Sequence, residues 1–133
     1  MSESPQSHSF PKGEKLTHKR VFEQLFNEGA QIRAFPLQLR YVRLNSIDKA
    51  PIKVAVTAPK RKFKQAVQRN RIKRMVREAY RRNKPMVFNN IEGNFAFLFL
   101  YLGNKVPVYL EVEQAMKQLL QDFLKKESHE KNV

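Results

Sequence analysis

The chain contains no cysteine, and it has only 12 acidic residues against 26 basic ones. The lack of cysteine excludes disulfides and thiol chemistry and fits a reducing compartment. No apolar run reaches the roughly 18 residues that a membrane-spanning helix needs, since the longest covers only residues 95–102. The N-terminus also lacks the basic-then-apolar order of a signal peptide. These absences predict a soluble, cytoplasmic protein that does not bind membranes.

A protein-borne active site is missing from the pattern as well. The three histidines, His8, His18 and His129, are scattered and have no metal-ligand spacing. The acids are dispersed, and none clusters with a histidine as a hydrolase would require. We therefore expect no catalytic residue and no metal site in the protein itself.

The pattern of apolar residues predicts one domain of the α+β class with the element order α-β-β-α-β-α. The expected elements are a helix that Thr17 can cap and that runs to about Glu28, strands at 33–44 and 52–58, a helix at about 66–82, a strand at 95–102 and a last helix just after Pro107. The apolar stripe of that last helix is Val112, Ala115, Met116, Leu119, Leu120, Phe123 and Leu124. A single sheet with helices packed on it, an α-β sandwich, is the economical arrangement. The predicted organisation is a flexible N-terminal arm at 1–14, one folded domain at 15–126 and a flexible tail at 127–133.

Nearly all of the net charge of +14 lies in one segment. Residues 53–84 contain 13 lysines and arginines but only one acid, Glu78, for a net charge of +12. Solvated surfaces usually mix the two signs, because pairs four residues apart then limit repulsion. A segment of one sign favours a polyanionic partner, and its arginines match phosphate with two parallel hydrogen bonds.

The predicted helix at 66–82 divides into two sides on a helical wheel. Ile72, Met75, Val76, Ala79 and Tyr80 form the apolar side. The opposite side presents the candidate RNA-binding residues of the helix, which are Arg69, Asn70, Arg71, Lys73, Arg74, Arg77 and Arg81. The preceding loop adds Lys60, Arg61 and Lys62 to the candidate RNA-binding surface.

Residues 53–61 and 66–80, with Arg69-Asn70-Arg71 at their centre, resemble the protein subunit of bacterial ribonuclease P. Phe10-Pro11-Lys12 and the segment 16–29 are also similar to that family. Members often carry Gly-Asn before the Ala-Val that opens the helix. This chain has Lys64-Gln65 there, which predicts a different turn.

The resemblance implies a ribosomal-protein-like α-β sandwich with a left-handed β-α-β crossover around the Arg-Asn-Arg helix. It implies that the protein is the non-catalytic subunit of an endoribonuclease that removes the 5′ leader of precursor tRNA. The expected partners are the catalytic RNA subunit and precursor tRNA, with Mg²⁺ bound mainly by the RNA. No protein partner is evident. The leader would lie in a cleft between the first helix and the sheet.

Four aromatic residues are candidates for that leader cleft: Phe22, Phe26, Phe35 and Tyr41. Single-stranded RNA stacks on aromatic rings with little sequence preference. Phe22 and Phe26 match aromatic positions of the family's first helix, although an i, i+4 phenylalanine pair also suits a hydrophobic core. Phe35 and Tyr41 come from the predicted first strand.

The high positive charge raises three other functions, and the sequence disfavours two of them. A ribosomal or other structured-RNA binding protein would explain the charge equally well. A helix-turn-helix DNA binder would pair two short helices through a tight turn, whereas this basic helix follows a strand and Pro59. A membrane-surface helix would carry larger apolar side chains opposite its basic residues and would need no sheet.

Overall fold

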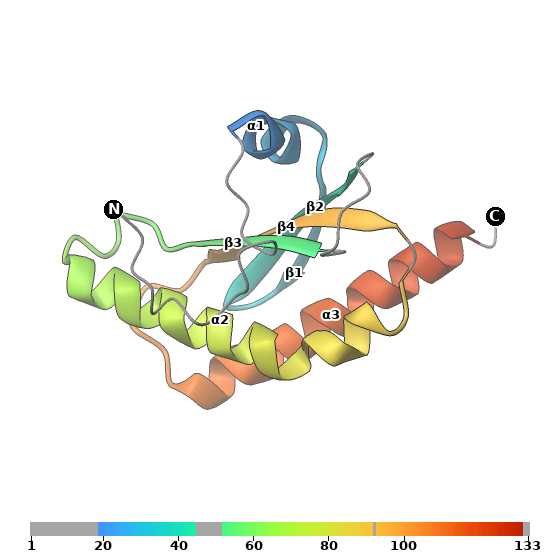
Figure 1. Ribbon diagram of the computed structural model, residues 1–133. Helices are drawn as coiled ribbons and strands as arrows, with labels where there is room; N and C mark the ends of the chain where they lie inside the picture. The colour runs from blue at the N-terminus through green and yellow to red at the C-terminus, as the bar shows by residue number, and fades with distance from the viewer. Residues whose placement is uncertain (1–18, 45–51, 92, 132–133) are drawn as a thin grey trace.

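The structure, a computed structural model, describes residues 19–44, 52–91 and 93–131. Its elements are α1 (Lys19–Glu28), β1 (Ala30–Ala34), β2 (Leu37–Leu44), β3 (Ile52–Thr57), α2 (Ala66–Phe88), β4 (Asn94–Tyr101) and α3 (Tyr109–Lys131). The strands form one sheet in the order β1-β2-β4-β3. Figure 1 shows α1 on one face of the sheet and both α2 and α3 on the other. The α+β sandwich that the sequence predicts is therefore present.

The predicted order lacks one strand, because the segment 33–44 is not continuous. It is divided at Phe35-Pro36, where a two-residue turn joins β1 to β2 in an antiparallel hairpin. The turn contains no Gly or Asn, which are the usual signals of such a hairpin, and the alternation of apolar residues runs straight through it. The described residues give the order α-β-β-β-α-β-α.

The central strand is β4, which pairs antiparallel with β2 and parallel with β3. Helix α2 connects the parallel pair, so the chain contains the predicted β-α-β crossover. The strand is buried on both of its faces, as its composition predicts. Phe95, Phe97 and Phe99 lie on the face that packs against α2 and α3, and Ala96 and Leu98 lie beneath α1.

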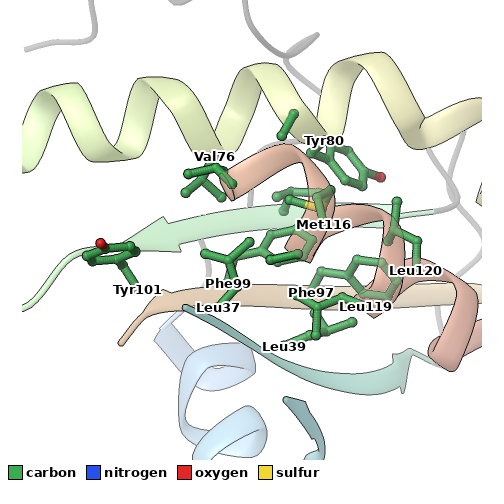
Figure 2. Close-up of a cluster of buried hydrophobic side chains, with 14 of the residues drawn as sticks. Leu37, Leu39, Val76, Tyr80, Phe97, Phe99, Tyr101, Met116, Leu119 and Leu120 are labelled. Atoms are coloured by element: carbon green, nitrogen blue, oxygen red, sulfur yellow. The ribbon is translucent and has the colours of Figure 1, made fainter. Parts of the chain in front are cut away.

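The main core lies between the sheet and the helix pair α2 and α3. Figure 2 shows Phe97 and Phe99 from β4 between leucines of β2 and side chains of both helices. The predicted apolar stripe of α3 faces this core, and Met116, Leu119 and Phe123 within it are fully buried. Each such side chain contributes about 1.5–3 kcal/mol by burial, which fixes α2 and α3 to the same face of the sheet.

The predicted end of α1 is confirmed, and Gly29 explains it. The backbone N–H of Gly29 donates to the carbonyl of Leu25 at 3.1 Å. A Cβ atom at this position would lie 2.4 Å from the same carbonyl oxygen. Only glycine therefore allows the chain to turn this closely from α1 into β1.

The predicted end of α2 is wrong, since the helix continues from residue 82 to Phe88 with Pro85 inside it. Pro85 lacks an N–H donor, but its carbonyl still accepts from the N–H of Asn89 at 3.1 Å. The last turn is held by burial, because Val87 is fully buried in the core.

Helix α3 likewise continues past residue 126 to Lys131. Glu127 accepts a hydrogen bond from Arg43 Nη2 at 2.9 Å, which ties this end of the helix to β2. The predicted arm at 1–14, the helix cap expected at Thr17 and residues 132–133 lie outside the described residues.

Candidate nucleic-acid interface

Helix α2 presents the predicted basic arc, which comprises Arg69, Asn70, Arg71, Lys73, Arg74, Arg77 and Arg81. The opposite side of the helix is anchored in the core, where Ile72, Val76 and Tyr80 are fully buried. Asn70, Arg71, Arg74 and Arg81 are exposed, and the other three members of the arc are half-buried. The division of α2 into an apolar and a basic side is confirmed.

A basic loop, residues 60–64, leads from β3 to α2 and adds cations beside the start of the arc. Lys60, Arg61 and Lys62 are exposed. Phe63 anchors the loop, because its ring is buried and lies 5.8 Å from the ring of Tyr101. The N–H of Phe63 donates to the carbonyl of Pro59 at 3.1 Å, and Lys62 Nζ donates to the carbonyl of Leu102 at 3.0 Å. The loop therefore has a defined conformation.

Arg69 joins the arc to this loop. Its Nη1 donates to the carbonyl of Phe63 at 2.7 Å and to the carbonyl of Lys64 at 3.0 Å. Gln65, the residue at the N-cap of α2, makes no side-chain capping bond. Lys64-Gln65 predicts a different turn at this point. In the structure, the side chain of Arg69, in the first turn of α2, is hydrogen-bonded to the backbone of this segment.

Lys73 lies in the most crowded part of the arc. Desolvation by burial lowers the pKa of its ammonium group, and the positive charges of Arg77 and Arg69 lower that pKa further. Each effect disfavours the charged form of lysine. An anion bound over this part of α2 would reduce the repulsion between Lys73 and the two arginines.

Glu78, the one acid within residues 53–84, changes the far end of the arc. Its carboxylate accepts two hydrogen bonds from Arg81, at 2.7 and 3.0 Å, and one from Arg82 at 3.1 Å. The hydrogen bond from Arg81 is the main reason why the pKa of Glu78 is lowered. Arg82 also lies 5.5 Å from the ring of Tyr109. Glu78 therefore partly neutralises the positive charge of Arg81 and Arg82 at this end of the arc.

The opposite face of the sheet carries α1. Leu25 is fully buried against Ala96 and Leu98, whereas Phe26 is 52% exposed. The side of α1 that carries Leu25 thus packs on the sheet, and the side that carries Phe26 borders solvent. Phe26 is therefore not a core residue. Phe22 lies in the helix, but its side chain is outside the described part of the structure.

Arg40 on β2 was not among the predicted residues, although it lies beside Phe26. Its guanidinium carbon is 5.2 Å from the centroid of the Phe26 ring. Strand periodicity was an available signal, because residue 40 must point away from the face that carries Leu39 and Tyr41. That signal did not reveal that α1 covers the same face as Arg40.

The α1 face of the sheet combines polar and apolar side chains. Gln38 Nε2 donates to Gln31 Oε1 at 2.9 Å, and the exposed Arg33 lies on the same face. The register places Thr57 beside Leu100 on this face as well. Amide, guanidinium and aromatic groups of this kind suit both the backbone and the bases of single-stranded RNA.

Two of the predicted cleft residues lie elsewhere. Tyr41 is buried on the opposite face of the sheet, where its ring lies 4.8 Å from that of Phe123. Phe35 is 73% exposed, but it belongs to the β1–β2 turn. There it lines a shallow pocket of about 340 Å³ against Glu111 and Gln114 of α3. Leu37, Leu39 and Tyr41 share one face of β2, as the alternation predicts, but that face packs against α2 and α3 and not beneath α1. Tyr41 therefore does not line a cleft under α1, and Phe35 lies in a hairpin turn that the sequence did not predict.

Metal-ligand clusters and membrane-spanning helices are both absent from the described residues. No group of three or more His, Asp or Glu side chains there lies close enough to hold a metal ion. Within the same residues, no helix is both long and apolar enough to cross a membrane.

The geometry defines a class of protein: an α+β domain with a strongly basic helix on one face of its sheet and a face of mixed polar and aromatic side chains on the other. A family model described as Ribonuclease P matches residues 10–124. The ribonuclease P protein component of Porphyromonas gingivalis is 33% identical over 121 residues, which is 88% of each chain. That of Chlorobaculum tepidum is 28% identical over 136 residues, covering 93% of this chain and 88% of its own.

Solved structures agree in fold. The ribonuclease P protein of Thermotoga maritima superposes with a TM-score of 0.66 at 21% identity, covering 82% of this chain and 96% of its own. That of Staphylococcus aureus gives 0.65 at 17% identity, covering 83% and 94%. With the family model spanning most of the chain, this protein belongs to the bacterial ribonuclease P protein family.

Proposed function

We propose that the chain is the protein subunit of ribonuclease P and that it binds the catalytic RNA subunit through the basic arc and the basic loop. The observation that carries this proposal is a single-sign surface on a rigidly anchored helix. Phosphate contacts need positive side chains at fixed positions, and the buried residues of α2 supply that fixity. Guanidinium groups such as those of Arg71 and Arg74 can each bind a phosphate through two hydrogen bonds.

The second part of the proposal concerns precursor tRNA. We propose that its 5′ leader runs along the α1 face of the sheet, past Phe26 and Arg40. An exposed ring offers a base-stacking surface, and the guanidinium 5.2 Å from it can reach an adjacent phosphate. The two RNA-binding surfaces then lie on opposite faces of one sheet (Figure 1), which lets one small protein contact the RNA subunit and the substrate together.

In this proposal the chemistry belongs to the RNA, with Mg²⁺ bound mainly by the RNA subunit and the substrate. The protein contributes positive charge and a surface for the leader. It would act in the cytoplasm, where precursor tRNA is made.

Reconstitution tests the proposal. The protein is mixed with a bacterial ribonuclease P RNA and precursor tRNA at a low Mg²⁺ concentration, and 5′ cleavage is measured. We expect cleavage to be stimulated only when both protein and RNA are present. Cleavage by the protein alone, after rigorous removal of contaminating nucleases, would contradict RNA-borne catalysis. No stimulation by the complete mixture would contradict the assignment as a subunit.

The leader surface is tested by binding of the assembled holoenzyme to tRNA with and without a leader. We expect Phe26→Ala and Arg40→Gln each to weaken binding of the precursor by about 1–3 kcal/mol, with little effect on mature tRNA. Phe35→Ala is the matched control, because Phe35 is also an exposed aromatic residue but lies at α3. Equal losses of affinity for the two RNAs, or an equal loss in Phe35→Ala, would contradict a leader-binding site on the α1 face.

A further inference from the structure

The basic loop has two fixed points of its own, and neither is at its junction with α2. Phe63 is buried beside Tyr101, and Lys62 Nζ reaches the carbonyl of Leu102. Both contacts tie the loop to the end of β4. The junction itself has no side-chain cap, because Gln65 makes no capping hydrogen bond. A helix start normally gains about 1 kcal/mol from such a cap.

Arg69 supplies a connection at this junction. Both of its hydrogen bonds from Nη1 go to carbonyls that precede the helix, those of Phe63 and Lys64. A guanidinium has five N–H donors in a rigid fork, and three of them are on Nε and Nη2. Arg69 can therefore hold the loop with one edge and face an anion with another.

The position of Arg69 makes this connection important for the shape of the surface. The backbone N–H of Arg69 donates to the carbonyl of Gln65 at 3.3 Å, so its backbone belongs to the first turn of α2. Its side chain reaches five and six residues back to the loop. Arg69 therefore links the loop that carries the cations at 60–62 directly to the first turn of α2, in addition to the contacts that tie each of them to the rest of the fold.

We propose that Arg69 is a positioning residue, which locks the basic loop to the first turn of α2 so that loop and arc form one continuous phosphate-binding surface. The inference rests on the proposed function, because it assigns a role within the RNA-binding surface. It differs from a plain phosphate contact in that the fork geometry of arginine matters in addition to the charge.

The first test is hydrogen exchange on the free protein, which involves no RNA. The readout is the amide of Phe63, which donates to Pro59 within the loop. We expect Arg69→Ala and Arg69→Lys each to speed its exchange by about two- to tenfold, the range that corresponds to one net hydrogen bond. Arg74→Ala, an exposed arc residue further along α2, should leave the exchange unchanged. Unchanged exchange in both Arg69 variants would overturn the proposal.

The second test is a double-mutant cycle for affinity to the ribonuclease P RNA. Arg61→Ala should cost about tenfold in the wild-type chain and in the Arg74→Ala background, but at most about threefold in the Arg69→Lys background. Lysine keeps the charge, so a reduced effect of Arg61→Ala there reports lost positioning. A full tenfold effect in the Arg69→Lys background would overturn the positioning role. If Arg61→Ala and Arg74→Ala both bind RNA with wild-type affinity, the loop and the arc do not form the RNA-binding surface. The proposed function of this surface and the positioning role of Arg69 are then both contradicted.

Discussion

Helices α2 and α3 have the same length and cover the same face of the sheet, but they differ in charge. Each has 23 residues, and both pack against the same face of the sheet and against each other (Figure 1). Yet α2 contains eight basic residues and one acid, whereas α3 contains four basic residues and five acids. Since the scaffold is shared, the difference shows that packing alone does not require the charge of α2. Helix α3 can therefore serve as a control for variants of α2.

The exposed side chains of the two helices behave accordingly. In α3, Gln118 Nε2 donates to Asp122 at 2.9 Å, and Glu127 accepts from Arg43. Those polar groups are used within the protein. In α2, Arg71 and Arg74 are exposed. The one acid of the helix, Glu78, accepts hydrogen bonds from Arg81 and Arg82. Exposed cations therefore outnumber acids on α2, whereas the two signs are nearly balanced on α3.

The largest effect should come from the packing role that α3 shares with α2. The ring of Phe123 lies 4.8 Å from Tyr41, 5.1 Å from Phe95 and 4.9 Å from Phe97. We expect Phe123→Ala to lower the free energy of unfolding by about 3–5 kcal/mol, as measured by urea denaturation. Leu110→Ala, at an exposed position of α3, should change it by no more than about 0.5 kcal/mol. A loss below about 1 kcal/mol for Phe123→Ala would place the core elsewhere.

The charge difference is tested by a pair of matched double variants. We expect Arg71→Ala/Arg74→Ala to lower affinity for the RNA subunit by about a hundredfold, since charge-assisted hydrogen bonds contribute about 1.5–3 kcal/mol each. The slope of log affinity against log salt should fall by about two units. Lys117→Ala/Lys125→Ala removes two exposed cations from α3 and should change affinity by less than about threefold. Equal losses for both pairs would mean that the RNA responds to net charge rather than to α2.

A smaller effect is expected from the one acid of α2. Glu78→Gln removes the carboxylate that holds Arg81 and Arg82. Because an exposed ion pair is worth about 0.2–1 kcal/mol, we expect RNA affinity to rise by about two- to threefold. Asp122→Asn is the control on α3 and should leave affinity unchanged. A decrease in affinity for Glu78→Gln would show that the carboxylate positions these arginines for RNA.

The smallest effect concerns Lys73. Its pKa is lowered in the folded state, so protonated Lys73 opposes folding at neutral pH. That penalty disappears as pH rises from the lowered pKa toward the ordinary value of 10.5. We expect Lys73→Gln to stabilise the free protein by about 0.5 kcal/mol and to weaken RNA binding.

The check is a series of thermal melts of the wild-type and Lys73→Gln proteins at increasing pH. The advantage of the variant should shrink as the pH approaches 10.5, because the wild-type lysine loses its charge in the folded state before it does so in the unfolded chain. A variant that is less stable than wild type at pH 7 would contradict the repulsion inferred for the arc.

The parts of the molecule that the sequence predicted are those governed by local spacing. The two sides of α2 and the buried stripe of α3 follow from period 3.6 patterns, and the burial of β4 on both faces follows from its continuous apolar run. The end of α1 follows from Gly29. Each of these features depends on residues that are near one another in the chain.

The features that the sequence did not predict depend on distant contacts or on unusual turns. Arg40 meets Phe26 only because α1 folds back over the face of β2 that carries Arg40. Tyr41 was assigned to the leader cleft because the alternation that groups it with Leu37 and Leu39 does not show which face of the sheet packs against α2 and α3. Pro85 is tolerated because Val87, two residues further along, is buried in the core. Spacing along the chain contains none of this information.

The attachment of the basic loop to the end of β4 has a consequence for synthesis on the ribosome. Among the described strands, β3 pairs only with β4, and Lys62 is bonded to Leu102, 40 residues later in the chain. A nascent chain that ends before residue 94 therefore has neither the pairing partner of β3 nor the anchor of the loop. We expect the assembled basic surface to form only after β4 has emerged from the exit tunnel, so that an unfinished chain does not yet display it to RNA.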